Sequence, residues 1–368
     1  MSDSNPTLLR TPLYDAHRQS GAKLVPFAGW EMPVQYKSGV ISEVNAVRQN
    51  AGLFDVSHMG RVRVHGADAL AFLQYISVND VAKLTPGKAQ YSLLCTDAGG
   101  VIDDIIVYRL GVSEFIVVVN ASNRVKALAW FETHRSRFPH LAIEDETFLT
   151  GLIAVQGPKA VKLADSLSDA DLTVLPRFGV TETAICDCPT MVARTGYTGE
   201  DGVELFCRNE DVETLWNALM KHGALPCGLG SRDTLRVEAC LPLYGHEMDE
   251  RTHPYEARLA WVVKTEKADP FVGQATLATL KSAPRDKVLV GVAMDGRAVP
   301  RDGYPVLDAA GEPVGHVTSG TFSPTLGKGI ALARVRASAS EVGTAIQVVI
   351  RDACHAAKVA ALPFYKKA

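Results

Sequence analysis

The chain changes character near residue 284, and this change constrains its fold more than any other feature. Before that point, stretches with the apolar spacing of amphipathic helices alternate with short apolar runs typical of strands. The expected helices cover 42–50, 66–77, 122–138, 158–169, 209–223 and 271–283, and the expected strands cover 61–65, 101–109, 114–120, 151–156, 191–196 and 203–207. After it come short strands with Gly, Pro and Asp turns and no long helix. We therefore expect an α+β fold followed by a small β-barrel or sandwich.

A short pattern occurs twice in the α+β part. "VRVHGADALAFL" (62–73) and "IAVQGPKAVKLA" (153–164) both place a strand before Gly66 or Gly157 and an amphipathic helix after it. Two related α+β units are the simplest interpretation. A chance recurrence stays open, because strand, glycine and helix often follow one another.

Composition excludes several classes of protein. The 368 residues, 47% of them hydrophobic, suffice for two or three globular domains, and a net charge of -3 provides no basic footprint for nucleic acid. The seven cysteines contain no C-x-x-C pair, which favours free thiols in a reducing compartment and argues against a zinc site. The first 21 residues lack an apolar leader, and no apolar run reaches membrane-spanning length. We expect a cytoplasmic protein without a metal or a membrane partner.

Two neighbouring carboxylates interrupt an apolar strand in "GGVIDDIIVYRL" (99–110). Successive strand side chains point to opposite faces, so Asp104 shares a face with Tyr108 and Asp103 lies on the other. A buried carboxylate costs several kcal/mol unless it is hydrogen-bonded or paired, so at least one of the two needs a partner. The alternative is that one of them caps the turn at Gly99 and Gly100 and stays solvated.

Two glycine-rich segments carry further candidate residues. In "RTGYTGEDGVEL" (194–205), Glu204 begins a strand among apolar neighbours, where a carboxylate can accept two parallel hydrogen bonds from an Arg, a guanine or a pterin. A structural Arg–Glu pair is the alternative. In "CGLGSRDTLRVEA" (227–239), Arg232 lies in the first turn of an expected helix, an arrangement that suits an anionic ligand. Here the alternative is a pair with Asp233 or Glu238.

Several common catalytic motifs are missing from the sequence. It contains no P-loop, no strand-borne G-x-G-x-x-G, no H-E-x-x-H and no G-x-S-x-G. His58 in "DVSHMG" is therefore interpreted as a structural residue.

Taken together, seven blocks closely resemble the aminomethyltransferase (T-protein) family of the glycine cleavage system. They are "FAGWEMPVQY" (27–36), "GLFDVSHMG" (52–60), "GKAQYSLLCTDAGGVIDDIIVY" (87–108), "RTGYTGEDGVEL" (194–205), "CGLGSRDTLRVEA" (227–239), "LYGHEMDE" (243–250) and "TSGTFSPTLGKGIALARV" (318–335). The resemblance implies a three-domain cloverleaf, with two related ferredoxin-like α+β units around a central tetrahydrofolate channel and a C-terminal antiparallel β-barrel. The implied domains are 1–50 with 146–283, 51–145 and 284–368.

The resemblance also assigns site residues. It implies that Asp104 is the catalytic carboxylate, that Glu204 holds the pterin edge and that Arg232 belongs to the folate site. The further residues in blocks that line the folate pocket of relatives are Met59, Tyr91, Tyr108, Asn120, Tyr197 and Trp261. His246 departs from the family, which more often has Gln there.

The implied reaction converts an S-aminomethyldihydrolipoyl carrier (H) protein and tetrahydrofolate to the dihydrolipoyl carrier, 5,10-methylenetetrahydrofolate and ammonia. Tetrahydrofolate is a co-substrate, the lipoylated carrier is the protein partner, and no metal is required. Two alternatives are a folate-dependent demethylase and a non-catalytic folate-binding protein of iron–sulfur maintenance. The K-G-C-Y-x-G-Q-E type motif of the second is absent.

Overall fold

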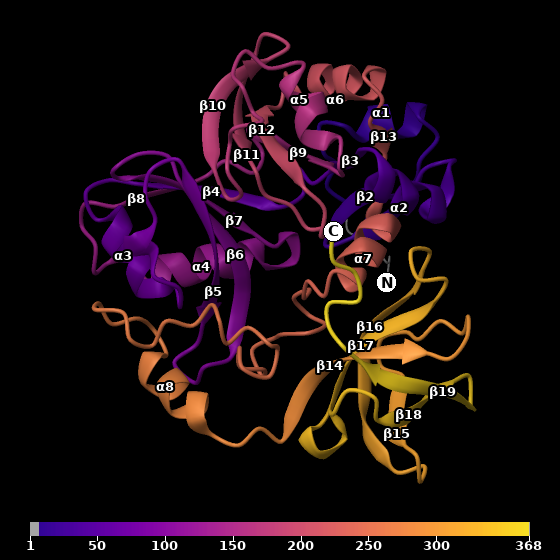
Figure 1. Ribbon diagram of the computed structural model, residues 1–368. Coiled ribbons are helices and arrows are strands. Elements are labelled where there is room, and N and C mark those ends of the chain that lie inside the picture. The colour runs from indigo at the N-terminus through magenta and orange to yellow at the C-terminus, as the bar shows by residue number, and fades with distance from the viewer. Residues whose placement is uncertain (1–6, 368) are drawn as a thin grey trace, which may run out of the picture. The chain divides into compact units, whose positions relative to one another are not determined.

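A computed structural model describes residues 7–367 (Figure 1). The chain divides into two compact units. The first unit contains the residues up to Arg63 together with Ile143–Gly196 and Glu200–Arg232. The second unit contains Val64–Ala142, Tyr197–Gly199 and the residues from Asp233 onward. The three-domain boundaries expected from the sequence stay a prediction.

The first unit is built on a six-stranded sheet. In spatial order its strands are β10 (Val180–Ile185), β11 (Cys188–Ala193), β12 (Gly202–Arg208), β9 (Thr150–Gln156), β3 (Gly52–Asp55) and β13 (Leu225–Pro226). Only β13 runs parallel to its neighbour. Helices α5 (Ala160–Asp165) and α6 (Val212–Lys221) pack on this sheet and bury an apolar core around Trp216.

The N-terminal part adds short elements to the first unit. They are α1 (Tyr14–Gln19), the hairpin of β1 (Lys23–Phe27) and β2 (Trp30–Gln35), and α2 (Gly39–Gln49). Only α2 corresponds to an element expected from the sequence, because α1, β1 and β2 are each six residues or shorter and carry little periodic signal.

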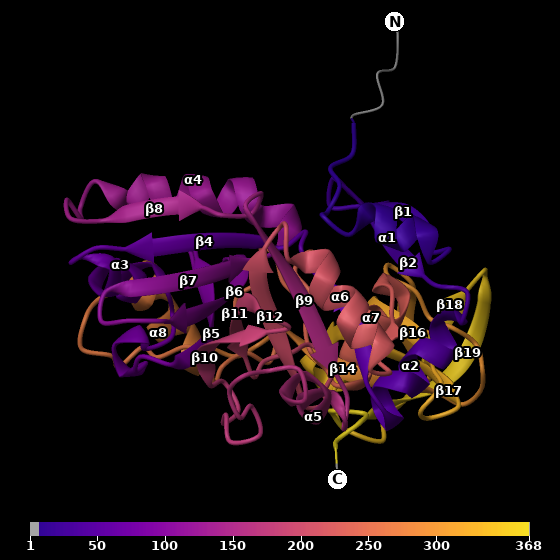
Figure 2. The same ribbon diagram turned by 90° about the horizontal axis from the view of Figure 1, so that it is seen from above.

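A second sheet has five strands. In spatial order they are β5 (Lys88–Cys95), β6 (Val101–Arg109), β7 (Glu114–Val119), β4 (Gly60–His65) and β8 (Ala142–Asp145). The expected hairpin of β6 and β7 is confirmed. Helix α4 (Arg124–Arg135) runs along this sheet in Figure 2 and packs against α3 (Ala69–Ile76) and β6. Short turns of 3₁₀ helix, η1 (Val81–Lys83) and η2 (Ala121–Asn123), follow α3 and β7.

The repeated strand–glycine–helix pattern is confirmed in both places. Gly66 lies between β4 and α3 at φ +112°, and Gly157 lies between β9 and α5 at φ +132°. A side chain at Gly66 would collide with the carbonyl oxygen of His140, and one at Gly157 with that of Asn50. Glycine is needed at both positions because the backbone is left-handed there and another chain segment passes close by.

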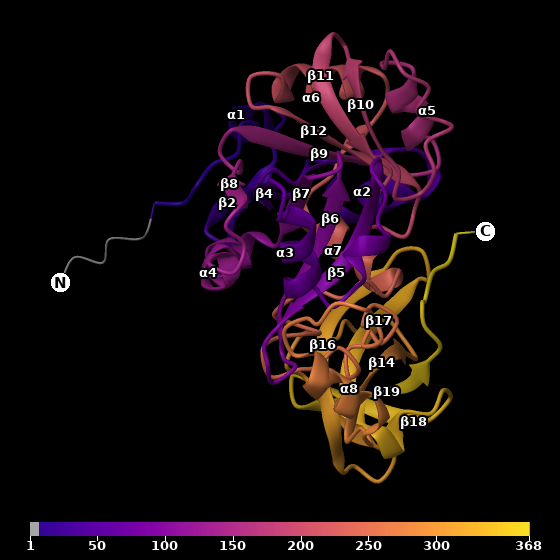
Figure 3. The same cartoon turned by 90° about the vertical axis from the view of Figure 1, so that its left-hand side faces the viewer.

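The C-terminal part forms a closed barrel of six antiparallel strands (Figure 3). Around the barrel these are β14 (Lys287–Met294), β17 (Lys328–Arg336), β16 (Pro313–Ser323), β15 (Pro305–Asp308), β18 (Ala345–Ile350) and β19 (Ala353–Ala360). A 3₁₀ turn, η3 (Ala337–Ala339), follows β17, and valine side chains fill much of the interior. The expected α+β class with a C-terminal antiparallel barrel is thus confirmed.

Two further helices precede the barrel. Helix α7 (Leu229–Glu238) places Arg232 in its first turn, as expected, and α8 (Gln274–Ser282) shortens the helix expected over 271–283. No helix within the described residues is long and apolar enough to cross a membrane.

Candidate functional site

Asp103 is fully buried on β6 and accepts three hydrogen bonds. Its Oδ1 accepts from Nδ2 of Asn120 at 2.8 Å and from Nδ2 of Asn123 at 2.6 Å, and its Oδ2 accepts from the backbone N–H of Asn120 at 3.0 Å. The expectation that one of the paired carboxylates has a partner is confirmed. The alternative, a solvated cap on the Gly99–Gly100 turn, is wrong for Asp103, because the partners come from the end of β7 and from η2.

Asp104 faces a different set of donors. Its Oδ1 accepts from Nδ2 of Asn120 at 2.7 Å, and its Oδ2 accepts from the Tyr91 hydroxyl on β5 at 3.1 Å. The amide of Asn120 therefore reaches both carboxylates, although the pleat sends their side chains to opposite faces. This is possible because Asn120 directly follows β7, beside β6, where one amide can bridge the two.

Burial and mutual repulsion shape the charge of this pair. Burial raises the pKa of both carboxyl groups, and the charge of Asp104 further raises the pKa of Asp103. Hydrogen bonds from Asn120 and Tyr91 oppose this shift at Asp104, while the charge of Glu247 adds to it. When ionised, the half-buried Asp104 is a partly desolvated anion that can stabilise a developing positive charge.

An aromatic surface lies beside Asp104. Tyr91 stacks on Trp261 with their ring centroids 5.8 Å apart and their planes 22° from parallel. Trp261 is 59% exposed. Burial and the neighbouring Asp104 raise the pKa of Tyr91, so its hydroxyl stays protonated and donates. An exposed indole beside a carboxylate suits a flat, polar heterocycle.

Two further tyrosines expected at the site occupy distinct surroundings in the second unit. The Tyr197 hydroxyl donates to the carbonyl oxygen of Pro242 at 2.5 Å. If Tyr197 were ionised, its negative charge would raise the pKa of Tyr91. Tyr108 lies on β6 like Asp104 but is only 1% exposed. The structure therefore joins Tyr91 and Asn120 to Asp104 by hydrogen bonds and stacks Trp261 on Tyr91. It also places Tyr197 within electrostatic reach of Tyr91.

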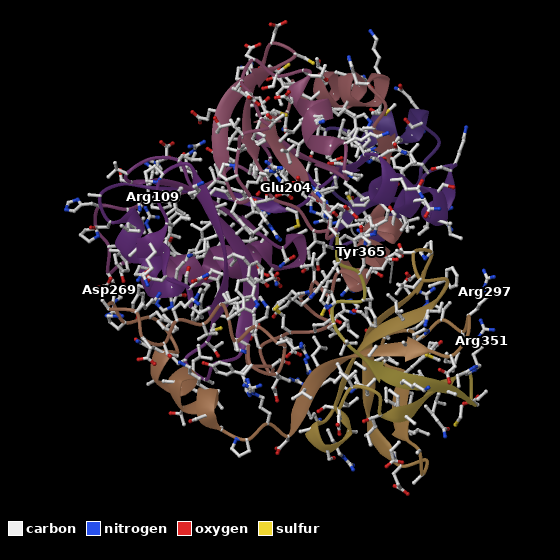
Figure 4. All side chains as sticks on the ribbon, in the orientation of Figure 1. Arg109, Glu204, Asp269, Arg297, Arg351 and Tyr365 are labelled. Atoms are coloured by element: carbon white, nitrogen blue, oxygen red, sulfur yellow. The ribbon has the colours of Figure 1, made fainter. Side chains whose placement is uncertain are left out.

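Glu204 is 7% exposed on β12 of the first unit (Figure 4). It lies opposite Ala154 of β9 on one side and Ala193 of β11 on the other, and Thr195 donates to its Oε2 at 2.5 Å. The adjacent turn is fixed by a bidentate pair in which Arg194 donates to Asp201 at 2.7 and 3.0 Å. The buried carboxylate expected after this turn is thus present.

Arg232 and the segment around Met59 lie near one another in the first unit. Met59 closes a turn by donating its N–H to the carbonyl of Val56 at 3.0 Å. The neighbouring His58 is buried, packs edge to face on Phe27, and its pKa is lowered to about 4, first by burial and also by the charge of Arg232. Arg232 therefore places positive charge beside this turn.

The acids that were candidates to pair with Arg232 have other partners. Asp233 accepts from Arg236 at 2.8 Å, and Glu238 accepts from Ser323 at 2.5 Å and Thr325 at 3.0 Å.

The sequence pattern did not predict two residues that act on the aspartate pair, Asn123 on Asp103 and Glu247 on Asp104. Asn123 was not singled out, although an amide three residues after Asn120 was a visible signal. Glu247 lies in the block "LYGHEMDE", in which the sequence comparison with the family singles out only His246. Within residues 7–367, no group of three His, Cys, Asp or Glu side chains is arranged to hold a metal ion.

Family models match both parts of the chain. The GCVT N-terminal domain matches residues 13–267, and the glycine cleavage T-protein C-terminal barrel domain matches residues 287–366.

Relatives match along the whole length. An aminomethyltransferase of Geobacillus thermodenitrificans is 48% identical over 366 residues, which cover 98% of this chain and 99% of that protein. One of Bacillus subtilis is 45% identical over 365 residues, covering 98% and 100%. The crystal structure of glycine cleavage system aminomethyltransferase T from Bartonella henselae superposes with a TM-score of 0.91 at 34% identity, covering 98% and 99% of the two chains.

Proposed function

This chain belongs to the glycine cleavage T-protein family, and we propose that it is the aminomethyltransferase of that system. In the proposed reaction an aminomethyl group leaves the sulfur of a dihydrolipoyl arm. The C–S bond and the C–N bond to the amino group break, and N5 and N10 of tetrahydrofolate take up the carbon. The products are 5,10-methylenetetrahydrofolate, the free thiol of the arm and ammonia, so no oxidant or reductant is needed.

The surroundings of Asp104 carry this proposal. Loss of ammonia from an S–CH₂–NH₂ group proceeds through a carbon with developing positive charge. A partly desolvated carboxylate held by Asn120 and Tyr91 stabilises such a charge more than water does, because its donors are already in place. Asp104 is the proposed catalytic residue, and positioning of the two substrates provides the rest of the rate enhancement.

The proposed folate contacts are the residues that the family resemblance implies. In the second unit, Trp261 and Tyr91 offer an aromatic surface, and Tyr108, Asn120 and Tyr197 complete the proposed set. In the first unit, Glu204 is the proposed acceptor for the pterin N–H and NH₂ edge, because a buried carboxylate matches that edge with two parallel hydrogen bonds. Arg232 and Met59 are the other proposed contacts there, and Arg232 would attract the glutamate carboxylates of folate.

The protein partner we propose is a lipoylated carrier protein, which delivers the aminomethyl group. A cytoplasmic location belongs to the same proposal and is supported by the seven free cysteines. The curated relatives favour this function over a demethylase or an iron–sulfur maintenance protein, since they are named aminomethyltransferases.

The decisive assay supplies an aminomethyl-loaded carrier protein and tetrahydrofolate and measures 5,10-methylenetetrahydrofolate and ammonia in equal amounts. Reactions with unloaded carrier, or without folate, serve as controls. Equal release of both products supports the proposal. Product no higher than in the enzyme-free control, with folded protein, contradicts it.

A further inference from the structure

The segment Leu241–Thr252 makes contacts to which the proposed reaction assigns no role. It contains the block "LYGHEMDE", yet it forms almost no regular secondary structure. Its conformation is fixed internally by Glu247, whose Oε2 accepts the backbone N–H of Leu243 at 2.9 Å. The carboxylate thus closes the loop from inside.

Glu247 is anchored by residues from three different elements. Arg236 of α7 donates to its Oε2 at 2.8 Å, and Thr318 of β16 donates to its Oε1 at 2.6 Å. Arg334 of β17 donates to its backbone carbonyl at 2.8 Å. Both Glu247 and Arg236 are almost completely buried, so this ion pair is fully desolvated.

The anchored segment contacts the strand that carries the aspartate pair. The N–H of Val101, the first residue of β6, donates to the carbonyls of Asp249 at 3.0 Å and Thr252 at 3.1 Å. Gly100 lies against Glu250 so closely that a Cβ there would collide with the Glu250 carbonyl oxygen. The start of β6, three residues before Asp104, is therefore set by this segment.

The same segment also holds Tyr197. The hydroxyl of Tyr197 donates to the carbonyl of Pro242, next to the Leu243 amide that Glu247 binds. A shift of Glu247 would therefore move both the hydroxyl acceptor of Tyr197 and the support under β6.

We propose that Glu247 is a positioning residue for the aminomethyl transfer: fixed by Arg236 and Thr318, it holds segment Leu241–Thr252 so that Asp104 and Tyr197 keep their places. This inference rests on the proposed function. Glu247 acts through the segment and through its charge.

The charge of Glu247 gives the proposal a distinctive signature. The side chains that act on Asp104 are Tyr91 on β5, Asn120 after β7 and the charged Glu247, and its sequence neighbour Asp103 lies on the opposite face of β6. Of these, Glu247 raises the pKa of Asp104 through its charge. Replacing Glu247 by a neutral side chain removes that anion, which favours the ionised form of Asp104.

The test compares Glu247→Gln with wild type in the proposed assay across pH. We expect kcat at neutral pH to fall by roughly tenfold, and the acid limb of kcat to move to lower pH by about half a unit or more. Thr318→Val removes one anchor but keeps the charge, so it should lower kcat at least about threefold without moving the acid limb. Glu132→Gln, an exposed residue of α4, is the matched control and should change neither.

A second readout does not depend on turnover. In protein labelled with ¹³C at the aspartate carboxyl carbons, the Asp104 resonance is identified by its loss in Asp104→Asn. Its titration should move to lower pH in Glu247→Gln and stay in place in Glu132→Gln. If wild type shows no folate-dependent turnover, the proposed function fails while this titration still decides the role of Glu247.

Three results would overturn the positioning role. One is a Glu247→Gln enzyme with wild-type kcat and acid limb and only a lower Tm. Another is an Asp104 resonance that titrates as in wild type. If Glu247→Gln does not fold, Thr318→Val decides, and an unchanged kcat in that variant rejects the proposal.

Discussion

The side-chain amide of Asn120 donates to Oδ1 of Asp104 at 2.7 Å, where Asp104 lies on β6 and Asn120 directly follows β7, its partner in one hairpin. The same nitrogen is 2.8 Å from Oδ1 of Asp103. A neutral amide is thus the main link between two carboxylates that repel each other. This arrangement keeps Asp104 in place without neutralising it, as a carboxylate that stabilises a cation requires.

Asp104→Asn should lower kcat by at least about a hundredfold, because it removes the charge that we propose stabilises the transition state. The fold should survive, since the Tyr91 hydroxyl can turn to accept from the new amide. Folate affinity, measured by calorimetry, should change little. A variant that keeps wild-type turnover would exclude Asp104 as the catalytic residue.

The wild-type pH profile should show the raised pKa of Asp104. Since burial raises this pKa, protonation removes the proposed catalytic anion at a pH well above 3.8, the usual value for aspartate. We expect kcat to fall as pH decreases through that range. The measurement is kcat with saturating substrates between pH 5 and pH 8. A kcat that stays constant down to pH 5 would contradict the expectation.

Asp103→Asn should act mainly on stability. The new Nδ2 group would face the backbone N–H of Asn120, so that two donors meet in a buried site, at a cost of about 1–3 kcal/mol. Chemical denaturation at pH 8 measures the loss. Abolished turnover in Asp103→Asn, together with an active Asp104→Asn, would reverse the two roles.

The aspartate pair shows which part of the candidate site the sequence predicts and which part it does not. Alternation along a strand and the cost of burying a charge predict that these carboxylates need partners. Neither argument identifies Asn120, because that residue is brought to Asp104 only by the pairing of β6 with β7. Glu247 was missed for the same reason: its anchors lie on α7, β16 and β17, up to 87 residues away in the sequence.

Glu204→Gln tests the proposed pterin contact. It preserves the shape of the side chain but replaces one acceptor with a donor, leaving a mismatch of about 1–3 kcal/mol with the pterin edge. Folate should then bind roughly tenfold more weakly or worse in calorimetry. Glu182→Gln on β10, where the side chain is exposed, is the control. Unchanged affinity in a folded Glu204→Gln protein removes Glu204 from the folate site.

His58→Gln should change how stability depends on pH. The pKa of His58 is lowered to about 4 in the folded protein, so folding favours the neutral ring. The neutral ring's contribution to the free energy of unfolding is fully present above pH 6.5. It is lost as pH falls toward 4, by up to roughly 3 kcal/mol. The difference in unfolding free energy between wild type and His58→Gln should therefore shrink between pH 7.5 and pH 4.5. A difference that stays constant over this range would show that the pKa of His58 is not lowered in the folded protein.

The fold, like the aspartate pair, could be predicted from the sequence only where the signal is local. The repeat around Gly66 and Gly157 and the change to short strands after residue 284 are local patterns, and both are confirmed. The hairpin of β1 and β2 and the two-residue β13 are too short to produce a periodic signal. They form because neighbouring elements provide strand edges to pair with and apolar surface to pack against. The pattern within one short segment does not show these neighbours.

The pairing of β3 has a consequence for how the chain is made. β3 (Gly52–Asp55) pairs with β9 and with β13 (Leu225–Pro226), so its last partner is synthesised about 170 residues later. At ribosomal rates of about 5–20 residues per second, β3 must wait roughly ten to thirty seconds for this neighbour. Meanwhile β5, β6 and β7 can pair as soon as they emerge, because they follow one another directly. Among the strands of residues 7–367, β3 therefore waits longest for its last partner and most needs protection by a chaperone in the meantime, and slowing translation before residue 226 should lower the yield of folded enzyme.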